Sequence, residues 1–188
     1  MADKSGLRKT YLNKRRVLSI NQVKEDSTKI ARGFTAFYAD YAREPVHIFL
    51  PILKQLEIDT WPIIEFLRDR EVSIVVSKSN FIDHTLSHYY LENDTELEVN
   101  SWGIPEPVKA KSASINQLEM VIIPLVIFDQ VGYRIGYGKG FYDKFLAQCP
   151  KNILKVGLSI FEAVPEISHD AHDVKMDFCI TPNKTYEF

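Results

Sequence analysis

The sequence contains little cysteine and no long hydrophobic run. Its two cysteines, Cys149 and Cys179, form no C-x-x-C pair and fit a reducing compartment better than a disulfide-stapled secreted fold. The longest apolar run, Met120–Phe128, is broken by Pro124 and is far too short to span a bilayer. The first residues, MADKSGLRKT, lack the apolar core of a signal peptide. We therefore expect a cytoplasmic protein without a membrane partner.

A strong net charge is also absent. The 23 basic and 25 acidic side chains leave a formal net charge of −2, which gives no overall attraction to nucleic acid or to an anionic membrane. Basic residues are nevertheless concentrated in the first segment, so any preference for anions is local and nucleic acid is not an expected partner. Those residues are Lys4, Arg8, Lys9, Lys14, Arg15 and Arg16.

Helices are predicted in the first third of the chain. Apolar residues that share one face predict a helix over about Lys4–Val17. Ser19–Gln22 has the capping-box form, so a second helix begins there, and Glu44-Pro45 ends it because proline disfavours helix in the preceding residue. Asp59 or Thr60 can cap a third helix.

Short apolar runs predict the strands. The expected strands are Val46–Leu50, Val72–Val76, Met120–Ile123, Leu154–Ile160 and Phe178–Thr181. The first two flank the third helix, an order that implies a parallel pair with a right-handed crossover. His88–Glu92 and Leu97–Val99 are typical of a hairpin or an edge excursion, and Trp102–Pro107 of a rigid irregular turn. We expect one α/β domain over residues 1–188, a three-layer fold in which helices flank an open, mostly parallel sheet.

One short stretch, YRIGYGKGFYDKFL at Tyr133–Leu146, is unusually rich in glycine. Together with Gly132, its glycines at 136, 138 and 140 make half of the eight in the chain. Glycines let the backbone adopt positive φ and approach a ligand closely. The stretch follows an apolar strand and precedes a predicted helix at Phe141–Cys149, and it carries Arg134 and Lys139. This combination predicts a phosphate site at the carboxyl ends of the strands.

The known phosphate fingerprints do not match this loop. A Walker A loop needs G-x-x-x-x-G-K-[ST], but Gly140 follows Lys139, and position 133 is tyrosine. A Rossmann fingerprint needs G-x-G-x-x-G, whereas these glycines alternate. A turn that is rich in glycine for backbone reasons alone is the simpler alternative. The interleaved arginine, lysine, tyrosine and aspartate favour a ligand site.

The loop resembles the signature of a known family. Arg134–Asp143 (RIGYGKGFYD) is similar to the R-L-G-x-G-x-G-Y-Y-D signature of the 5-formyltetrahydrofolate cyclo-ligases, also called 5,10-methenyltetrahydrofolate synthetases. Ile123–Asp129 resembles the strand and P-x-x-x-F-D entry of that family. Ile135 replaces the usual leucine, and Phe141 stands where the family commonly has tyrosine, so a ring is kept and a hydroxyl is lost.

The resemblance extends over nearly the whole chain. Lys4–Arg8 is similar to K-x-x-L-R, and Glu57–Thr60 resembles E-[IV]-[DE]-T. Gly103–Pro107 matches a G-I-P-E-P turn, and Asp173–Thr181 resembles the closing D-x-x-x-D-x-x-x-T. The resemblance implies conversion of 5-formyltetrahydrofolate and ATP to 5,10-methenyltetrahydrofolate, ADP and phosphate, with Mg²⁺. In this reaction the formyl oxygen is phosphorylated, N10 adds to the activated carbon, and phosphate leaves as the ring closes.

The resemblance also assigns roles to the phosphate-binding residues. Arg134 and Lys139 are candidates to stabilise charge on the transferred phosphoryl group. Asp143 is the first candidate for Mg²⁺, with Asp177 as the second. The implied ATP-binding residues are Lys4, Arg8, Arg134, Gly136, Gly138, Lys139, Gly140 and Tyr142. A solvated basic face is the alternative for Lys4 and Arg8, and a capping or surface carboxylate is the alternative for Asp177.

The implied folate-binding residues complete the expected site. Glu57 would accept hydrogen bonds from the donor-rich face of the pterin, although a surface glutamate leading a helix is nearly as good a reading. Tyr137, Phe141 and Tyr142 would line the folate side, and Tyr142 could instead belong to the core. Two alternatives stay open, a sugar-phosphate isomerase-like enzyme and a non-catalytic folate- or nucleotide-binding protein on the same scaffold. We expect a monomer or a weak dimer.

Overall fold

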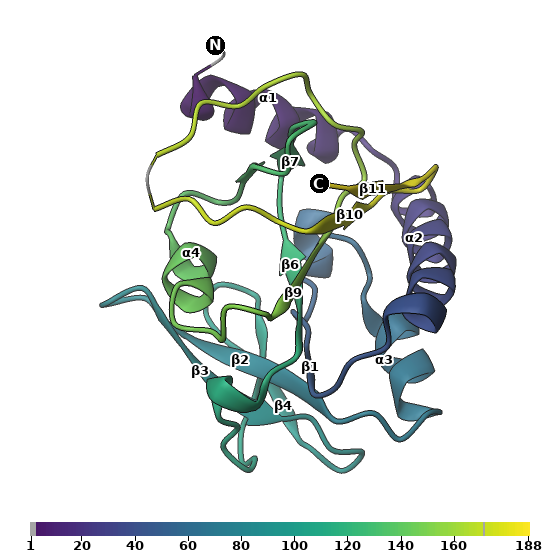
Figure 1. Cartoon of the computed structure of the whole chain (residues 1–188), viewed down its shortest axis with the longest axis vertical. Helices are drawn as coiled ribbons and strands as arrows, with labels where there is room; N and C mark the ends of the chain where they lie inside the picture. The colour runs from purple at the N-terminus through teal and green to yellow at the C-terminus, as the bar shows by residue number, and fades with distance from the viewer. Residues whose placement is uncertain (1–2, 171) are drawn as a thin grey trace.

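The computed structural model describes residues 3–170 and 172–188 and has three layers (Figure 1). A seven-stranded sheet forms the middle layer. Helices α2 (Ile20–Tyr41) and α3 (Trp61–Arg68) cover one face, and α4 (Phe141–Leu146) lies on the other. Helix α1 (Lys4–Arg16) lies across one end of the sheet, in contact with β7 (Ile127–Phe128). The fold is the expected single α/β domain.

The sheet is parallel except at its two edges. Its strands are β1 (Val46–His47), β2 (Ile74–Asn80), β3 (Thr85–Tyr90), β6 (Met120–Pro124), β9 (Leu154–Leu158), β10 (Phe178–Ile180) and β11 (Thr185–Glu187). They lie in the order β11-β10-β9-β6-β1-β2-β3. The five inner strands run parallel, while β3 and β11 pair antiparallel with their neighbours. Open sheets of this kind place ligand sites at the carboxyl ends of their strands.

The central strand β6 is apolar throughout because both of its faces are covered. Met120 and Ile122 belong to the core beneath α2 and α3, whereas Val121 and Ile123 belong to the core beneath α4. All four side chains have an exposed fraction of 0%. Alternation along a strand sends successive side chains to opposite faces, so a strand buried on both sides reads as one continuous hydrophobic run.

The helix starts follow the predicted capping residues. The Ser19 hydroxyl accepts a hydrogen bond of 3.1 Å from the backbone N–H of Gln22. The Gln22 side chain points along α2 instead of back to Ser19, so only half of the capping box forms. The Asp59 carboxylate, rather than the Thr60 hydroxyl, accepts from the N–H of Trp61 at the start of α3. Within the two described ranges, no helix is long and apolar enough to cross a membrane.

The chain around residues 85–107 differs from the prediction. The expected hairpin between His88–Glu92 and Leu97–Val99 is wrong, because β3 pairs with β2 at the sheet edge. Strand β4 (Leu97–Val99) instead pairs antiparallel with β5 (Pro105–Pro107), inside the segment expected to be an irregular turn. Two prolines fit a short edge ribbon, where half of the backbone N–H groups need no partner strand. Strand β11 was not predicted, because its three residues carry little apolar signal.

A small hairpin separates β6 from the glycine-rich stretch. Strands β7 and β8 (Arg134–Ile135) pair antiparallel, and Gly132 lies in the turn between them at φ +98°. A Cβ on Gly132 would lie 2.8 Å from the Phe188 ring. Gly132 therefore serves this turn, and Gly136–Gly140 alone forms the loop before α4, which we call the glycine loop.

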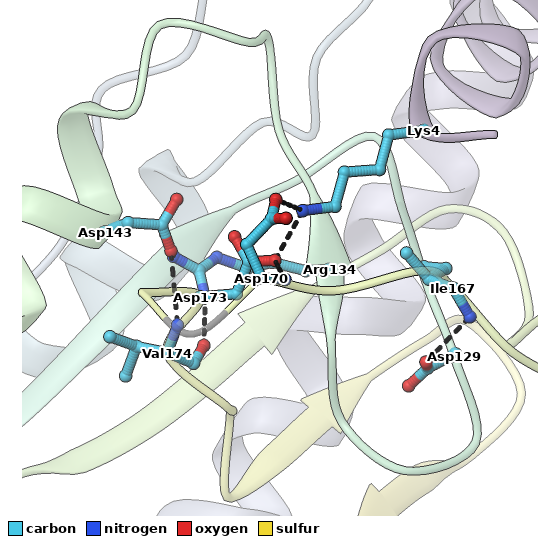
Figure 2. Close-up of polar contacts among 8 residues, drawn as sticks. All are labelled: Lys4, Asp129, Arg134, Asp143, Ile167, Asp170, Asp173 and Val174. Carbon is cyan, nitrogen blue, oxygen red and sulfur yellow. Dashed lines mark hydrogen bonds and ion pairs between the residues drawn. The ribbon is translucent and has the colours of Figure 1, made fainter.

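Asp129 fixes the hairpin that carries the glycine loop. This side chain is fully buried, and one carboxylate oxygen accepts from the N–H groups of Val131 and Tyr133 at 3.1 and 2.9 Å. The other oxygen accepts from the N–H of Ile167 at 3.0 Å, which ties the later segment to the hairpin (Figure 2). A carboxylate that satisfies three backbone donors is costly to remove, because buried N–H groups left without partners lose their solvation.

Replacement of Asp129 should therefore destabilise the fold. We expect Asp129→Ala to lower the free energy of unfolding by about 2–4 kcal/mol, because three backbone N–H groups lose their acceptor. Asp94→Ala, at an exposed position outside the strands, is the matched control and should change it by less than about 0.5 kcal/mol. Urea unfolding followed by circular dichroism measures both. Equal stability of the two variants would contradict this role of Asp129.

Candidate active site

A cavity of about 370 Å³ lies where the inner strands end. Phe49 follows β1, Ser77 and Ser79 belong to the second half of β2, and Pro124 ends β6, and all four line the cavity. The glycine loop forms another wall, and α1 reaches it from outside the sheet. The position at the carboxyl ends of parallel strands is the one that the fold favours for a ligand.

Nearly all of the site residues predicted from the sequence line this cavity. Twelve of the thirteen predicted site residues line it, and only Asp177 does not. The twelve are Lys4, Arg8, Glu57, Arg134, Gly136, Tyr137, Gly138, Lys139, Gly140, Phe141, Tyr142 and Asp143.

The glycine loop is shaped by its close contact with α1. The Arg8 guanidinium donates from Nε to the carbonyl oxygen of Gly136 at 2.8 Å. Gly138 has φ +86°, and a Cβ there would lie 3.1 Å from the Arg8 guanidinium carbon. Gly140 has φ +72°, and a Cβ there would meet open space. The glycines thus allow a left-handed backbone and let Arg8 lie against the loop.

Two of the predicted cations that line the cavity are held by carboxylates (Figure 2). Arg134, whose side chain is 5% exposed, donates from Nη2 to Asp143 at 2.7 Å and from Nη1 to the carbonyl oxygen of Val174 at 2.5 Å. Lys4 contacts the carboxylates of Asp170 at 2.7 Å and Asp173 at 2.5 Å. Two positively charged groups therefore contact three carboxylates here, so their formal charges nearly balance.

Lys139 differs from these two cations. Its side chain lies on the exposed glycine loop, and it forms no ion pair within the ranges that the structure describes. A lysine with this freedom can reach an anion that enters the cavity without first breaking a salt bridge.

The structure does not bring Asp177 to Asp143. Asp177 accepts from the backbone N–H of Lys155 at 2.8 Å and pairs with the Lys155 ammonium at 2.8 Å, so it joins β9 to the segment that leads into β10. Asp173, four residues earlier, lines the cavity together with Asp143. Burial pushes the pKa of Asp173 up, but hydrogen bonds from Lys4 and the Asp170 backbone and the nearby positive charges outweigh it and leave the pKa below its ordinary value.

Asp173 is thus the carboxylate that sequence reasoning missed in this region. The spacing of the closing motif pointed to Asp177, which has the same residue type and lies in the same segment. The two carboxylates, Asp173 and Asp177, differ in where the folded chain places them. Among the described residues, no group of three or more histidine, cysteine, aspartate or glutamate side chains is arranged to hold a metal ion.

Glu57, in the cavity wall, belongs to a chain of hydrogen-bonded polar groups. One carboxylate oxygen accepts from the Tyr137 hydroxyl, and the other accepts from the N–H of Ile52 at 2.7 Å. The Tyr137 hydroxyl in turn accepts from Arg15 Nη1 at 2.7 Å. Burial raises the pKa of Glu57, while these hydrogen bonds and the Arg15 charge act in the opposite direction.

Arg15 is a second residue that sequence reasoning did not connect with the site, although it does not line the cavity and reaches it only through the Tyr137 hydroxyl. It stands eleven residues after Lys4, about three helical turns, so the two share a face of α1 with Arg8. The eleven-residue spacing from Lys4 could have identified Arg15 as a residue on the same helix face. It did not stand out because Arg15 lies between two other basic residues, Lys14 and Arg16.

Aromatic rings form the remaining wall. Phe141 packs edge-on against Phe81 at 5.3 Å between ring centroids, and Phe81 stacks on Trp102 at 4.7 Å. Both partners also line the cavity. Burial raises the pKa of Tyr142, whose ring packs against Phe145 of the core, so this residue serves the cavity and the core together. Phe81 stands at the tip of the β2–β3 hairpin, and no sequence pattern pointed to it.

This chain is similar to known proteins over most of its length. A chain from Mycoplasma pneumoniae named 5-formyltetrahydrofolate cyclo-ligase is 28% identical over 184 residues, which cover 95% of this chain and 98% of that one. A mouse protein of the same name is 26% identical over 186 residues, 93% of this chain and 91% of the relative. A probable cyclo-ligase of Schizosaccharomyces pombe matches 118 residues at 34% identity, 54% of this chain and 57% of its own length.

The fold comparison agrees. The 5,10-methenyltetrahydrofolate synthetase of Aquifex aeolicus superposes with a TM-score of 0.81 at 27% identity, over 98% of this chain and 92% of that chain. The synthetase of Mycoplasma pneumoniae gives a TM-score of 0.74 at 25% identity, over 96% of this chain and 99% of that chain. The model of the 5-formyltetrahydrofolate cyclo-ligase family matches residues 1–182, so this chain belongs to the 5-formyltetrahydrofolate cyclo-ligase family.

Proposed function

We propose that the protein is an ATP-dependent ligase that converts 5-formyltetrahydrofolate to 5,10-methenyltetrahydrofolate with release of ADP and phosphate. The observation that carries this proposal is one cavity lined by two different sets of residues, which we call its two ends. Cations and glycine backbone suited to phosphates form the phosphate end, and a buried carboxylate with aromatic rings forms the folate end. Both substrates of the family reaction can therefore meet over the glycine loop.

The cationic end supports binding of the ATP phosphates. Lys4 and Arg8 extend from α1, Arg134 comes from β8, and Lys139 comes from the loop, so the cations approach from different directions. Convergent positive charge and backbone without Cβ atoms suit a triphosphate. Gly136, Gly138 and Gly140 supply that backbone, and Tyr142 at the start of α4 bounds it.

The carboxylates at this end fit a magnesium ion that accompanies ATP. Magnesium prefers oxygen ligands and usually keeps several waters while it binds one or two carboxylates and the phosphates of its substrate. Asp143 and Asp173 offer such oxygens in the cavity wall, and we propose them as the residues that would hold it. Asp177 is the weaker candidate because Lys155 already occupies its carboxylate. The ion would neutralise phosphate charge during transfer.

The other end supports folate binding. Glu57 can accept paired hydrogen bonds from the donor-rich edge of a pterin, and its burial makes such charge-assisted bonds strong. Tyr137 and Phe141 offer flat apolar walls to the pterin and benzoyl rings, with Tyr142 beside them. Phe141 keeps this contact without the hydroxyl that the family commonly has at its position.

The chain's own contribution to the reaction is placement and charge stabilisation. An amide oxygen leaves poorly until it is phosphorylated, so the formyl oxygen must first meet the γ-phosphate in line. Arg134 and Lys139 would stabilise the negative charge that develops on the transferred group. The proximity of N10 to the activated carbon then closes the ring with loss of phosphate.

Two expectations about the working protein remain proposals. The unpaired thiols of Cys149 and Cys179 support a reducing compartment such as the cytoplasm. A monomer or a weak dimer stays our expectation.

The reaction itself gives the first test. Mixing the protein with 5-formyltetrahydrofolate and Mg-ATP should produce the absorbance of a methenyl-folate, and omission of ATP should abolish it. A binding protein without catalytic activity would be stabilised by folate or ATP against heat without forming product. Absence of product together with absence of an ATP effect on the melting temperature would contradict the cyclo-ligase proposal.

Loss of the Lys139 ammonium should slow the chemical step. We expect Lys139→Ala to lower kcat by at least about tenfold, because charge on the transferring phosphoryl group loses a stabilising ammonium. Lys151→Ala, an exposed lysine outside the cavity, is the matched control and should leave kcat unchanged. Initial rates at saturating substrates measure the effect, and unchanged turnover in Lys139→Ala would refute this role.

The proposed metal ligands can be tested without turnover. We expect Mg²⁺ to raise the melting temperature of the ATP-bound wild-type protein, because a ligand that binds only the folded state stabilises it. Asp173→Asn should lose most of that Mg²⁺-dependent increment and keep the increment due to ATP alone. Asp177→Asn is the comparison variant. If its Mg²⁺ increment is the one that disappears, the assignment of Asp173 is wrong.

A further inference from the structure

Arg15 is a buried cation that none of the roles above uses. Its exposed fraction is 7%, and its one side-chain hydrogen bond within the described ranges goes to the Tyr137 hydroxyl. It makes no direct ion pair with a carboxylate in those ranges. A guanidinium buried in this way is costly unless an anion lies close enough to compensate it.

Glu57 is the complementary group. Its exposed fraction is 5%, and its carboxylate likewise has no direct cationic partner in the described part of the chain. The Tyr137 hydroxyl lies between the two, since it donates to Glu57 and accepts from Arg15. One hydroxyl has one proton to give and lone pairs to accept, so both contacts can exist together. The buried cation and the buried anion are thus one hydroxyl apart.

We propose that Arg15, Tyr137 and Glu57 form an ion pair bridged by a hydroxyl, and that Arg15 is a positioning residue which keeps Glu57 ionised for recognition of the folate substrate. The folate part of this inference rests on the function proposed above. Arg15 acts through the other two residues, because it does not line the main cavity.

Arg15 lines a second, small cavity next to the main one. This space of about 20 Å³ is lined by Arg15, Glu57 and Tyr137 together with apolar side chains, and it is large enough for one water molecule. Glu57 and Tyr137 line both cavities, as do Phe49 and Pro124, so the two spaces adjoin. Arg15, from α1, lines only the small cavity and contacts the Tyr137 hydroxyl.

Removal of Arg15 should change the pKa of Glu57 in a definite direction. Burial raises the pKa of Glu57, and the Tyr137 hydroxyl, the Ile52 N–H and the Arg15 charge oppose that rise. The titratable groups that act on Glu57 are Tyr137 of the glycine loop, Arg15 of α1 and Tyr142 of α4. Without Arg15 no cation remains among them, so the pKa of Glu57 must rise further. The carboxyl would then be neutral below that raised pKa, and folate binding would weaken as the pH falls.

The test measures binding of 5-formyltetrahydrofolate without ATP, by titration calorimetry at pH 6 and at pH 8.5. Wild type should bind at both pH values. Arg15→Met should weaken binding by about tenfold or more at pH 6 and by much less at pH 8.5, because only the neutral carboxyl loses the charge-assisted contacts. Its KM for ATP should stay near that of wild type. Arg15→Lys keeps the charge and should restore part of the affinity at pH 6.

Arg16→Met is the matched control, since Arg16 is the exposed neighbour of Arg15 on the same helix and should leave folate binding unchanged at both pH values. Circular dichroism verifies that each variant folds. If Arg15→Met does not fold, Tyr137→Phe, which removes only the bridging hydroxyl, must show the same pH-dependent loss.

The double variant Arg15→Met with Glu57→Gln completes the cycle. Once the carboxylate is gone, Arg15→Met should cost little further affinity, because contacts that act as a unit are not additive. Equal losses at both pH values, or additive losses in the double variant, would overturn the proposal and leave Arg15 a structural contact. Failure of the wild type to bind 5-formyltetrahydrofolate would instead contradict the proposed function, and this inference with it.

Discussion

The direct contact between α1 and the glycine loop is the constraint on which the site depends. Arg8 bonds to Gly136 and lies close against the loop, where a Cβ on residue 138 would come within 3.1 Å of its guanidinium carbon. The contact turns one face of α1 toward the cavity. Lys4, Arg8 and Arg15, which share that face, then reach three different partners. Lys4 contacts Asp170 and Asp173, Arg8 the loop backbone, and Arg15 the Tyr137 hydroxyl. One helix therefore contacts both the proposed phosphate end and the proposed folate end.

Charge compensation organises the rest of the cavity. At the phosphate end, Lys4 and Arg134 lie against Asp173 and Asp143, so the proposed ligand, Mg-ATP, would meet cations that already have carboxylate partners. Ligand and metal could exchange partners there without leaving a lone buried charge, which would be costly. At the folate end, the Tyr137 hydroxyl links the positive charge of Arg15 to the negative charge of Glu57. The Glu57 carboxylate still lines the cavity.

Features that follow from local sequence patterns could be predicted. Features that depend on how distant segments pack together could not. The buried run of β6, the Ser19 cap and the glycine loop follow from short-range rules, and the structure has them. Asp173 and Asp177 look alike in sequence, and only tertiary packing sends one to the cavity and the other to Lys155. The polar strand β11 and the cavity-lining Phe81 carry no periodic signal, so sequence reasoning had no means to place them.

The Lys4–Asp173 contact also has a consequence for biosynthesis. Its two residues are 169 positions apart, which is nearly the full length of the chain. Proteins are made from the N-terminus onward, so Lys4 of α1 is made long before the carboxylate that pairs with it. The contact can form only after Asp173 has been made. A growing chain that has not reached Asp173 therefore lacks both this carboxylate and the ion pair that holds Lys4 against the cavity.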